Sequence, residues 1–86
     1  MTGAQTPRRV RADGPKIREI RRTRILDGRR AMTAADLAMR CDMTRRAINM
    51  IENGVTQRPY ERTMRAIAVA LQVSVDAITL PEPESA

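Results

Sequence analysis

The segment from residue 33 to residue 54 constrains the fold most, because it reads as two short helices joined by a tight turn, TAADLAMRCDMTRRAINMIENG. With successive residues about 100° apart around a helix, the second helix divides into two faces that do not mix. Its outer face holds Arg45, Arg46, Asn49, Met50 and Asn53, and its apolar face holds Ala47, Ile48 and Ile51. Thr44 suits the N-cap of this helix, and Gly54 suits the left-handed residue that ends one. The sequence therefore predicts a helix with one buried face and one face directed outward.

The outer face is rich in hydrogen-bond donors, because it carries two adjacent arginines and two asparagines with no acid among them. Such donors suit the edges of bases and the phosphates of nucleic acid. The alternative interpretation is an ordinary solvated surface, since mixed polar faces are the norm for surface helices.

The chain has 86 residues, which allows one small core and no second domain. It contains no Phe or Trp, and Tyr60 is its single aromatic residue, so the core must consist of Ile, Leu, Val, Met and Ala. This composition, together with the scarcity of alternating β-branched runs, favours packed helices over a sheet. The expected fold class is all-α.

The formal net charge is +6, and it is distributed unevenly. Residues 1–30 carry ten of the 16 basic residues and three of the ten acidic ones. This imbalance suits a polyanion, and nucleic acid is favoured over an anionic membrane surface because no segment is apolar enough to insert. Fifteen of the basic residues are arginine, the side chain that makes bidentate contacts to guanine and phosphate, although a GC-rich genome would produce the same bias.

The composition gives no support for an enzyme active site or for a metal-binding site. Histidine is absent and Cys41 is the single cysteine, which excludes a zinc site, a thiol–imidazole pair and an internal disulfide. We therefore expect no metal, no cofactor and no enzymatic activity. The chain starts without a hydrophobic signal region, and with the lone thiol this indicates the cytoplasm and no membrane association.

The pattern along the chain predicts five helices and no strand. Residues 1–13 read as a mobile basic arm carrying Arg8, Arg9 and Arg11, with an idle disordered leader as the alternative. A first helix starts at Pro15 under an Asp13 or Gly14 cap and ends near Gly28, with Ile17, Ile20 and Ile25 as its buried stripe. Thr33 and Asp36 form a variant capping box for the second helix. The fourth helix starts near Tyr60, and its inward residues are Met64, Ile67, Ala68 and Leu71. The fifth helix runs from Ser74 to Thr79, with Val75 and Ile78 inward. Residues 81–86 form a disordered acidic tail.

These features together resemble the Cro/C1-type helix-turn-helix domains of phage repressors and related bacterial regulators, also called the XRE family. The resemblance covers residues 14–80, which are expected to form one compact, lambda-repressor-like, five-helix domain. The matching positions are residues 17–21, Leu37-Ala38, Thr44, Ile48, residues 51–54, Arg58-Pro59, Thr63-Met64, Ile67-Ala68, Ala70-Leu71 and residues 73–75.

The resemblance implies that the third helix enters the major groove of DNA. It places Arg45, Arg46, Asn49 and Met50 nearest the bases, and Thr44, Asn53, Gln57 and Arg58 near the phosphates. The arm residues Arg8, Arg9 and Arg11 are further candidates for the minor groove or the backbone. The resemblance also implies a structural ion pair between Glu52 and Arg21, with Arg24 as the reserve partner.

Three positions depart from the family pattern. Ala34 replaces a usual glutamine, so a phosphate contact at the start of the second helix is lost. Asp42 replaces the usual turn glycine, which Asp tolerates better than most residues. Several extra residues lie between Arg21 and Thr33, so the first helix is longer or a loop is inserted.

The expected function is that of a sequence-specific transcriptional regulator, most simply a repressor that binds a two-fold operator in double-stranded DNA as a homodimer. The alternative is an antitoxin-type protein that binds a partner toxin and also regulates its own promoter.

Overall fold

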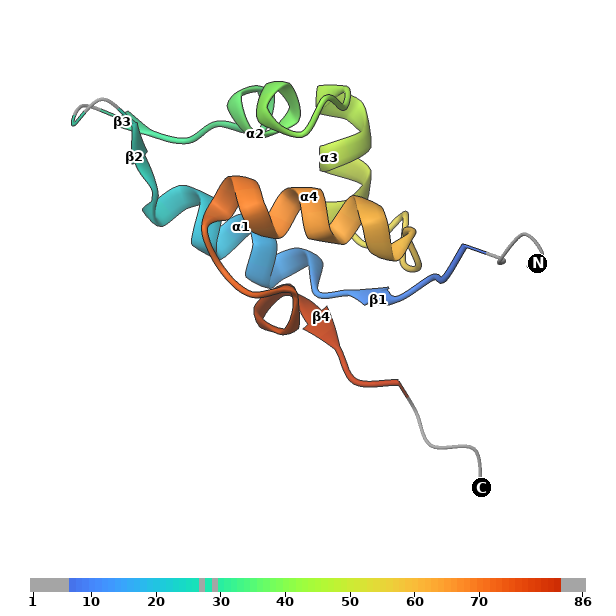
Figure 1. The fold of residues 1–86 in the computed structure, drawn as a ribbon. Helices are drawn as coiled ribbons and strands as arrows, with labels where there is room; N and C mark the ends of the chain where they lie inside the picture. The colour runs from blue at the N-terminus through green and yellow to red at the C-terminus, as the bar shows by residue number, and fades with distance from the viewer. Residues whose placement is uncertain (1–6, 27, 29, 83–86) are drawn as a thin grey trace, which may run out of the picture.

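Four short α-helices and one 3-10 helix build this protein in the computed structural model, which describes residues 7–26, 28 and 30–82 (Figure 1). Four two-residue strands form two small antiparallel pairs. The elements in chain order are β1 (Arg11–Ala12), α1 (Gly14–Thr23), β2 (Ile25–Leu26), β3 (Arg30–Ala31), α2 (Ala34–Arg40), α3 (Arg45–Glu52), α4 (Glu61–Leu71), the 3-10 helix η1 (Val75–Ile78) and β4 (Thr79–Leu80).

The helices begin where their capping residues stand. The Asp13 carboxylate accepts from the Lys16 amide at the start of α1. Thr33 and Asp36 form a reciprocal capping box at the start of α2. The Thr44 hydroxyl accepts from the Ala47 amide at the start of α3. Each cap satisfies an amide that the first helical turn leaves unpaired, and these predictions are confirmed.

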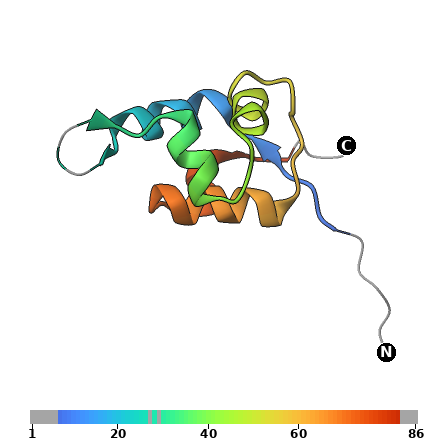
Figure 2. The same ribbon diagram turned by 90° about the horizontal axis from the view of Figure 1, so that it is seen from above.

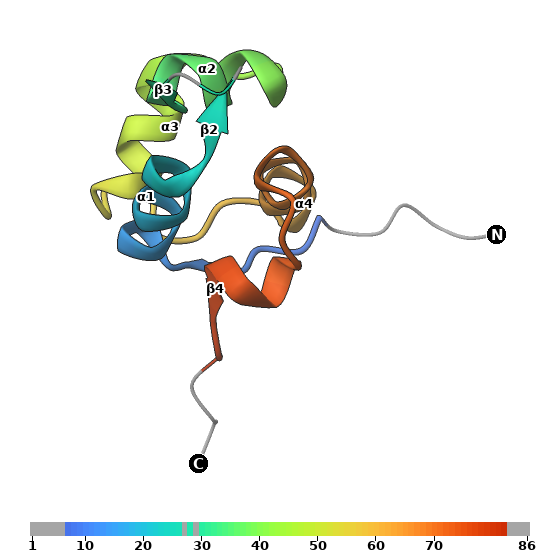
Figure 3. The same ribbon diagram turned by 90° about the vertical axis from the view of Figure 1, so that its left-hand side faces the viewer.

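One continuous apolar core joins all of the helices. Its fully buried side chains are Ile17, Leu37, Ile48, Met64, Ile67, Leu71 and Ile78. The stripe expected on the fourth helix is confirmed, because Met64, Ile67, Ala68 and Leu71 are all buried. In Figure 3, α2 and α3 lie on one side of α1 and α4, and β4 lies on the opposite side. Among the described residues, no helix combines the length and apolarity needed to cross a membrane.

Two short strands after α1 pair as a hairpin, so of the two alternatives for the extra residues, a longer first helix or an inserted loop, the longer helix is wrong. Helix α1 ends at Thr23, and β2 pairs with β3 so that Ile25 faces Ala31. Ile25, which the helical stripe predicts to be buried, is 59% exposed. Gly28 adopts a φ of 69° in the connection, where a left-handed residue turns the chain back. The hairpin extends from one end of the molecule, away from α3 (Figure 2).

The expected fifth helix is a four-residue 3-10 helix, and the prediction of no strand is also wrong. The segment between Ser74 and Thr79 forms one 3-10 turn of four residues, and this turn buries Ile78. Its end continues directly into β4, which pairs with β1 in the register Arg11 to Leu80 and Ala12 to Thr79. The architecture is therefore mostly helical with two small strand pairs.

The residues just before α1 belong to the folded domain. Val10 is 7% exposed, and its amide donates to the Pro59 carbonyl at 3.0 Å. The Ala12 amide donates to the Gln57 carbonyl, also at 3.0 Å. The expected mobile arm is therefore corrected over residues 7–13, because strand pairing and burial of Val10 hold them in place. Residues 1–6 of the arm and 83–86 of the acidic tail lie outside the described residues.

Candidate nucleic-acid interface

The outer face of α3 presents its predicted residues together. Arg45 and Arg46 are exposed, whereas Asn49 and Met50 are half-buried. These four side chains, with Asn53 and Val55, line one shallow concave surface, which we call the α3 surface. Ile48, Ile51 and Glu52 are buried on the other side of the helix.

The two arginines of the α3 surface are not paired with an acidic residue in the described part of the chain. Among the described residues, neither Arg45 nor Arg46 forms an ion pair or a side-chain hydrogen bond. Their guanidinium donors are therefore available to an external acceptor. An arginine can donate two hydrogen bonds to guanine O6 and N7, and an asparagine such as Asn49 can pair with adenine N6 and N7. Met50 can add only an apolar contact, which suits a thymine methyl group.

The turn between α2 and α3 sets the direction of α3. Asp42, which stands where the resemblance implies a glycine, takes a left-handed conformation with a φ of 57°. The Met43 amide donates to the Ala38 carbonyl at 2.8 Å, which closes the turn against the end of α2. Cys41 is half-buried beside this turn, and burial raises the pKa of its thiol.

A buried ion pair joins α3 to α1. The Arg21 guanidinium donates from Nε to Glu52 Oε2 at 2.7 Å and from Nη2 to Glu52 Oε1 at 2.8 Å. Its third nitrogen, Nη1, donates to the Met32 carbonyl at 3.0 Å. Hydrogen bonding to Glu52 raises the pKa of Arg21. The reserve candidate, Arg24, instead donates from Nε to the Leu71 carbonyl at 2.8 Å.

The four residues expected at the phosphates do not form one group. Thr44 caps α3, and Asn53 lies on the α3 surface, where its Oδ1 accepts from Arg18 Nη2. Gln57 and Arg58 line a separate depression with Arg11, Ala12 and Leu80. Arg58 pairs there with Glu82, at 3.0 Å between Nη1 and Oε1. The guanidinium of Arg58, which was expected to contact a phosphate, is therefore paired with the Glu82 carboxylate.

The three arginines of the expected arm are held against the domain. Arg8 pairs with Glu61 at 3.7 Å, and Arg11 Nη1 donates to the Pro81 carbonyl at 2.8 Å. Arg9 donates to the Arg58 carbonyl at 3.0 Å and to the Tyr60 hydroxyl at 2.9 Å.

Tyr60 and Arg62 lie near this interface, but the sequence pattern did not identify either as a functional residue. The pattern indicates Tyr60 only as the start of a helix, and it gives Arg62 no role. In the fold, the guanidinium groups of Arg9 and Arg62 both lie over the Tyr60 ring. The available signal was the single aromatic residue of the chain standing between Arg58 and Arg62.

No group of side chains in the described part of the chain could hold a metal ion, because no three Cys, Asp or Glu side chains lie close enough together. The arrangement of exposed arginine and asparagine on a short, capped helix is instead suited to hydrogen bonding with a polyanion.

Comparison with known proteins agrees with this geometry. Residues 17–78 match the sequence profile of the helix-turn-helix family. The matched segment includes the whole of α2, the turn and α3. Neither a curated protein nor a solved structure matches the chain.

Proposed function

Because this chain belongs to the Cro/C1-type helix-turn-helix family of DNA-binding transcription regulators, we propose that it is a repressor that occupies a two-fold operator as a homodimer. The observation that carries this proposal is the α3 surface. Arg45, Arg46, Asn49 and Met50 lie there side by side, with both arginines exposed and unpaired within the described residues.

The length of α3 supports the two-fold site. Eight residues at 1.5 Å each make a helix of about 12 Å, which spans only a few base pairs in the major groove. A site of that length recurs too often in a genome to be selective. Two copies of the domain on half-sites about one helical turn apart would double the number of bases read.

Repression follows most simply from occupancy. Among the described residues the chain forms one small helix-turn-helix unit with one core. A domain of this kind that covers a promoter excludes other proteins from the same DNA without any further contact.

Selection of bound duplexes from a random DNA pool tests the proposal. We expect a recovered site with two inverted halves whose centres lie about 10–10.5 base pairs apart, or a multiple of that spacing. The mass of the complex in solution should correspond to two copies of the chain per duplex. A pool without any shared site, or a complex of one copy on an asymmetric site, would contradict it.

A further inference from the structure

Two arginines from distant parts of the sequence converge on the Tyr60 ring. The guanidinium carbon of Arg9 lies 4.2 Å from the ring centroid, and that of Arg62 lies 4.9 Å from it. Both distances are within the range of a cation–π interaction. The two hydrogen bonds that Arg9 donates, to the Tyr60 hydroxyl and the Arg58 carbonyl, further restrict its orientation. We call Arg9, Tyr60 and Arg62 the Tyr60 cluster.

The cations of the Tyr60 cluster are not neutralised. Neither Arg9 nor Arg62 meets a carboxylate among the described residues, and the ring is the only partner described for Arg62. The nearest acid in sequence, Glu61, is engaged by Arg8 at 3.7 Å and by Arg65 at 3.5 Å. Two like charges held beside one ring repel each other, and an anion bound to both would remove that repulsion. A phosphate, with several acceptor oxygens, suits two guanidinium groups well.

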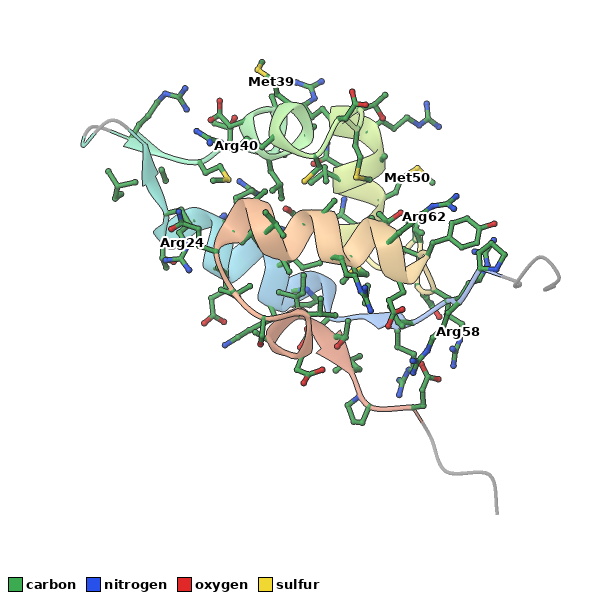
Figure 4. The ribbon with its side chains drawn as sticks, in the orientation of Figure 1. Arg24, Met39, Arg40, Met50, Arg58 and Arg62 are labelled. Carbon is green, nitrogen blue, oxygen red and sulfur yellow. The ribbon has the colours of Figure 1, made fainter. Side chains whose placement is uncertain are left out.

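The Tyr60 cluster lies next to the α3 surface. Arg9 and Tyr60 line a mostly apolar depression together with Met43, Met50 and Thr63. Met50 also lines the α3 surface with Arg45 and Arg46, so the two surfaces adjoin at this side chain. In Figure 4, Met50 and Arg62 lie toward the same end of the molecule. An anion on the cluster would therefore lie beside whatever α3 contacts.

We propose that Arg9 and Arg62, held against the Tyr60 ring, form a phosphate-binding site for the DNA backbone at the edge of the groove that α3 enters. This inference rests on the proposed function, since it takes DNA as the ligand of α3. The contact would be made by a side chain of the N-terminal segment and one of α4, and it carries no base sequence. Arg9 acts here from a fixed position in the folded domain.

Binding of the full chain to two fluorescent duplexes, the selected site and an unrelated sequence of equal length, tests this site. The affinity is measured across a range of salt concentrations. Log K falls as log salt rises, so the slope of log K against log salt is negative. Each of Arg9→Gln and Arg62→Gln should make it shallower by about 0.9, which corresponds to one phosphate contact. The loss at low salt should be similar in fold for both duplexes, because a phosphate contact does not distinguish sequences.

Arg65→Gln is the matched control. It removes the same charge from the same helix, but Arg65 is paired with Glu61 and lies outside the Tyr60 cluster. Its slope should equal that of the parent protein. Slopes for Arg9→Gln and Arg62→Gln that equal that of Arg65→Gln would overturn the phosphate site. The proposed function is judged separately by the preference of the parent protein for the selected duplex.

Discussion

The carboxylate of Glu52 in α3 accepts two hydrogen bonds from the guanidinium of Arg21 in α1, at 2.7 and 2.8 Å, where both residues are buried. Arg18 adds a third contact, at 3.3 Å between its Nε and Glu52 Oε1. The pair fixes the end of α3 relative to α1. It also turns the one acid of α3 away from the surface that carries Arg45 and Arg46.

Removing the charge of Glu52 should destabilise the domain strongly. Glu52→Gln leaves Arg21 buried without a carboxylate, which typically costs about 3–5 kcal/mol. For a domain of this size each kcal/mol lowers the melting temperature by about 4–8 °C. Urea unfolding measures the change, and Glu19→Gln is the control because Glu19 forms an exposed pair with Lys16 at 3.6 Å. A loss in Glu52→Gln no larger than that of the control would show that the buried pair is not needed for stability.

The capping box of α2 should make the stability depend on pH in the acid range. The guanidinium of Arg30 and hydrogen bonds from the Thr33 amide and hydroxyl hold the pKa of Asp36 far below its usual range. A carboxylate whose pKa is lowered by folding contributes stability above its unfolded pKa of about 3.9, and that contribution is lost as the pH falls toward the folded pKa. Asp36→Asn should therefore be less stable than the parent at pH 6, and the difference should shrink between about pH 4 and pH 2, as measured by the urea midpoint at each pH. A difference that stays constant over this range would contradict the prediction.

Replacing Gly14 with alanine should destabilise the protein, although alanine is the better helix former. A Cβ at this position would lie 2.4 Å from the Ile51 carbonyl oxygen and 2.6 Å from that of Glu52. These are backbone atoms at the end of α3, so α1 and α3 would have to move apart. Overpacking of this kind typically costs about 1–3 kcal/mol. Urea unfolding of Gly14→Ala checks this, and a stability equal to or above that of the parent would contradict the close approach of the two helices.

Truncation of the α3 arginines should weaken specific binding and leave the fold intact. Arg45→Ala and Arg46→Ala should each cost about 1–3 kcal/mol on the selected duplex, with much less effect on unrelated DNA. Both residues are exposed, so the urea midpoint should not change. Arg22→Ala, which removes an exposed arginine from the end of α1, is the control for the loss of charge. Unchanged affinity of both α3 variants for the selected duplex would contradict the placement of α3 in the groove.

The acid after β4 should compete with DNA for Arg58. Glu82 occupies this guanidinium at 3.0 Å, and both side chains are about half exposed. Glu82→Gln should raise the affinity for DNA by up to about fivefold, because exposed ion pairs of this kind contribute about 0–1 kcal/mol. Fluorescence anisotropy at low salt measures the change, with Asp76→Asn as a control that removes another exposed acid. Equal affinities of the two variants would show that Glu82 does not restrain Arg58.

Features that depend on neighbouring residues could be predicted from the amino-acid sequence. The helical repeat of Met64, Ile67 and Leu71 was sufficient to identify their buried face. The caps at Thr33 and Thr44 were predictable because a capping side chain reaches an amide only two or three residues away.

Most partners of the charged residues could not be predicted without the folded chain. The pairing of Arg21 with Glu52 was implied by the family resemblance, but nothing in the sequence indicates that the nearby Arg24 donates to the Leu71 carbonyl. Residues 7–13 have the composition of a mobile arm, but Val10 enters the core and β1 finds β4 near the other end of the chain.

Local sequence was enough to define the helix-turn-helix segment and the two faces of α3, because a helical period and its caps involve contacts within a few residues. Only the tertiary structure decided that the N-terminal segment is docked, that the insertion after α1 is a hairpin, and that Arg9 and Arg62 meet at Tyr60. The contact between Arg9 and Tyr60 joins residues 51 positions apart, and its formation depends on how the whole chain packs around Ile17, Ile48 and Ile67.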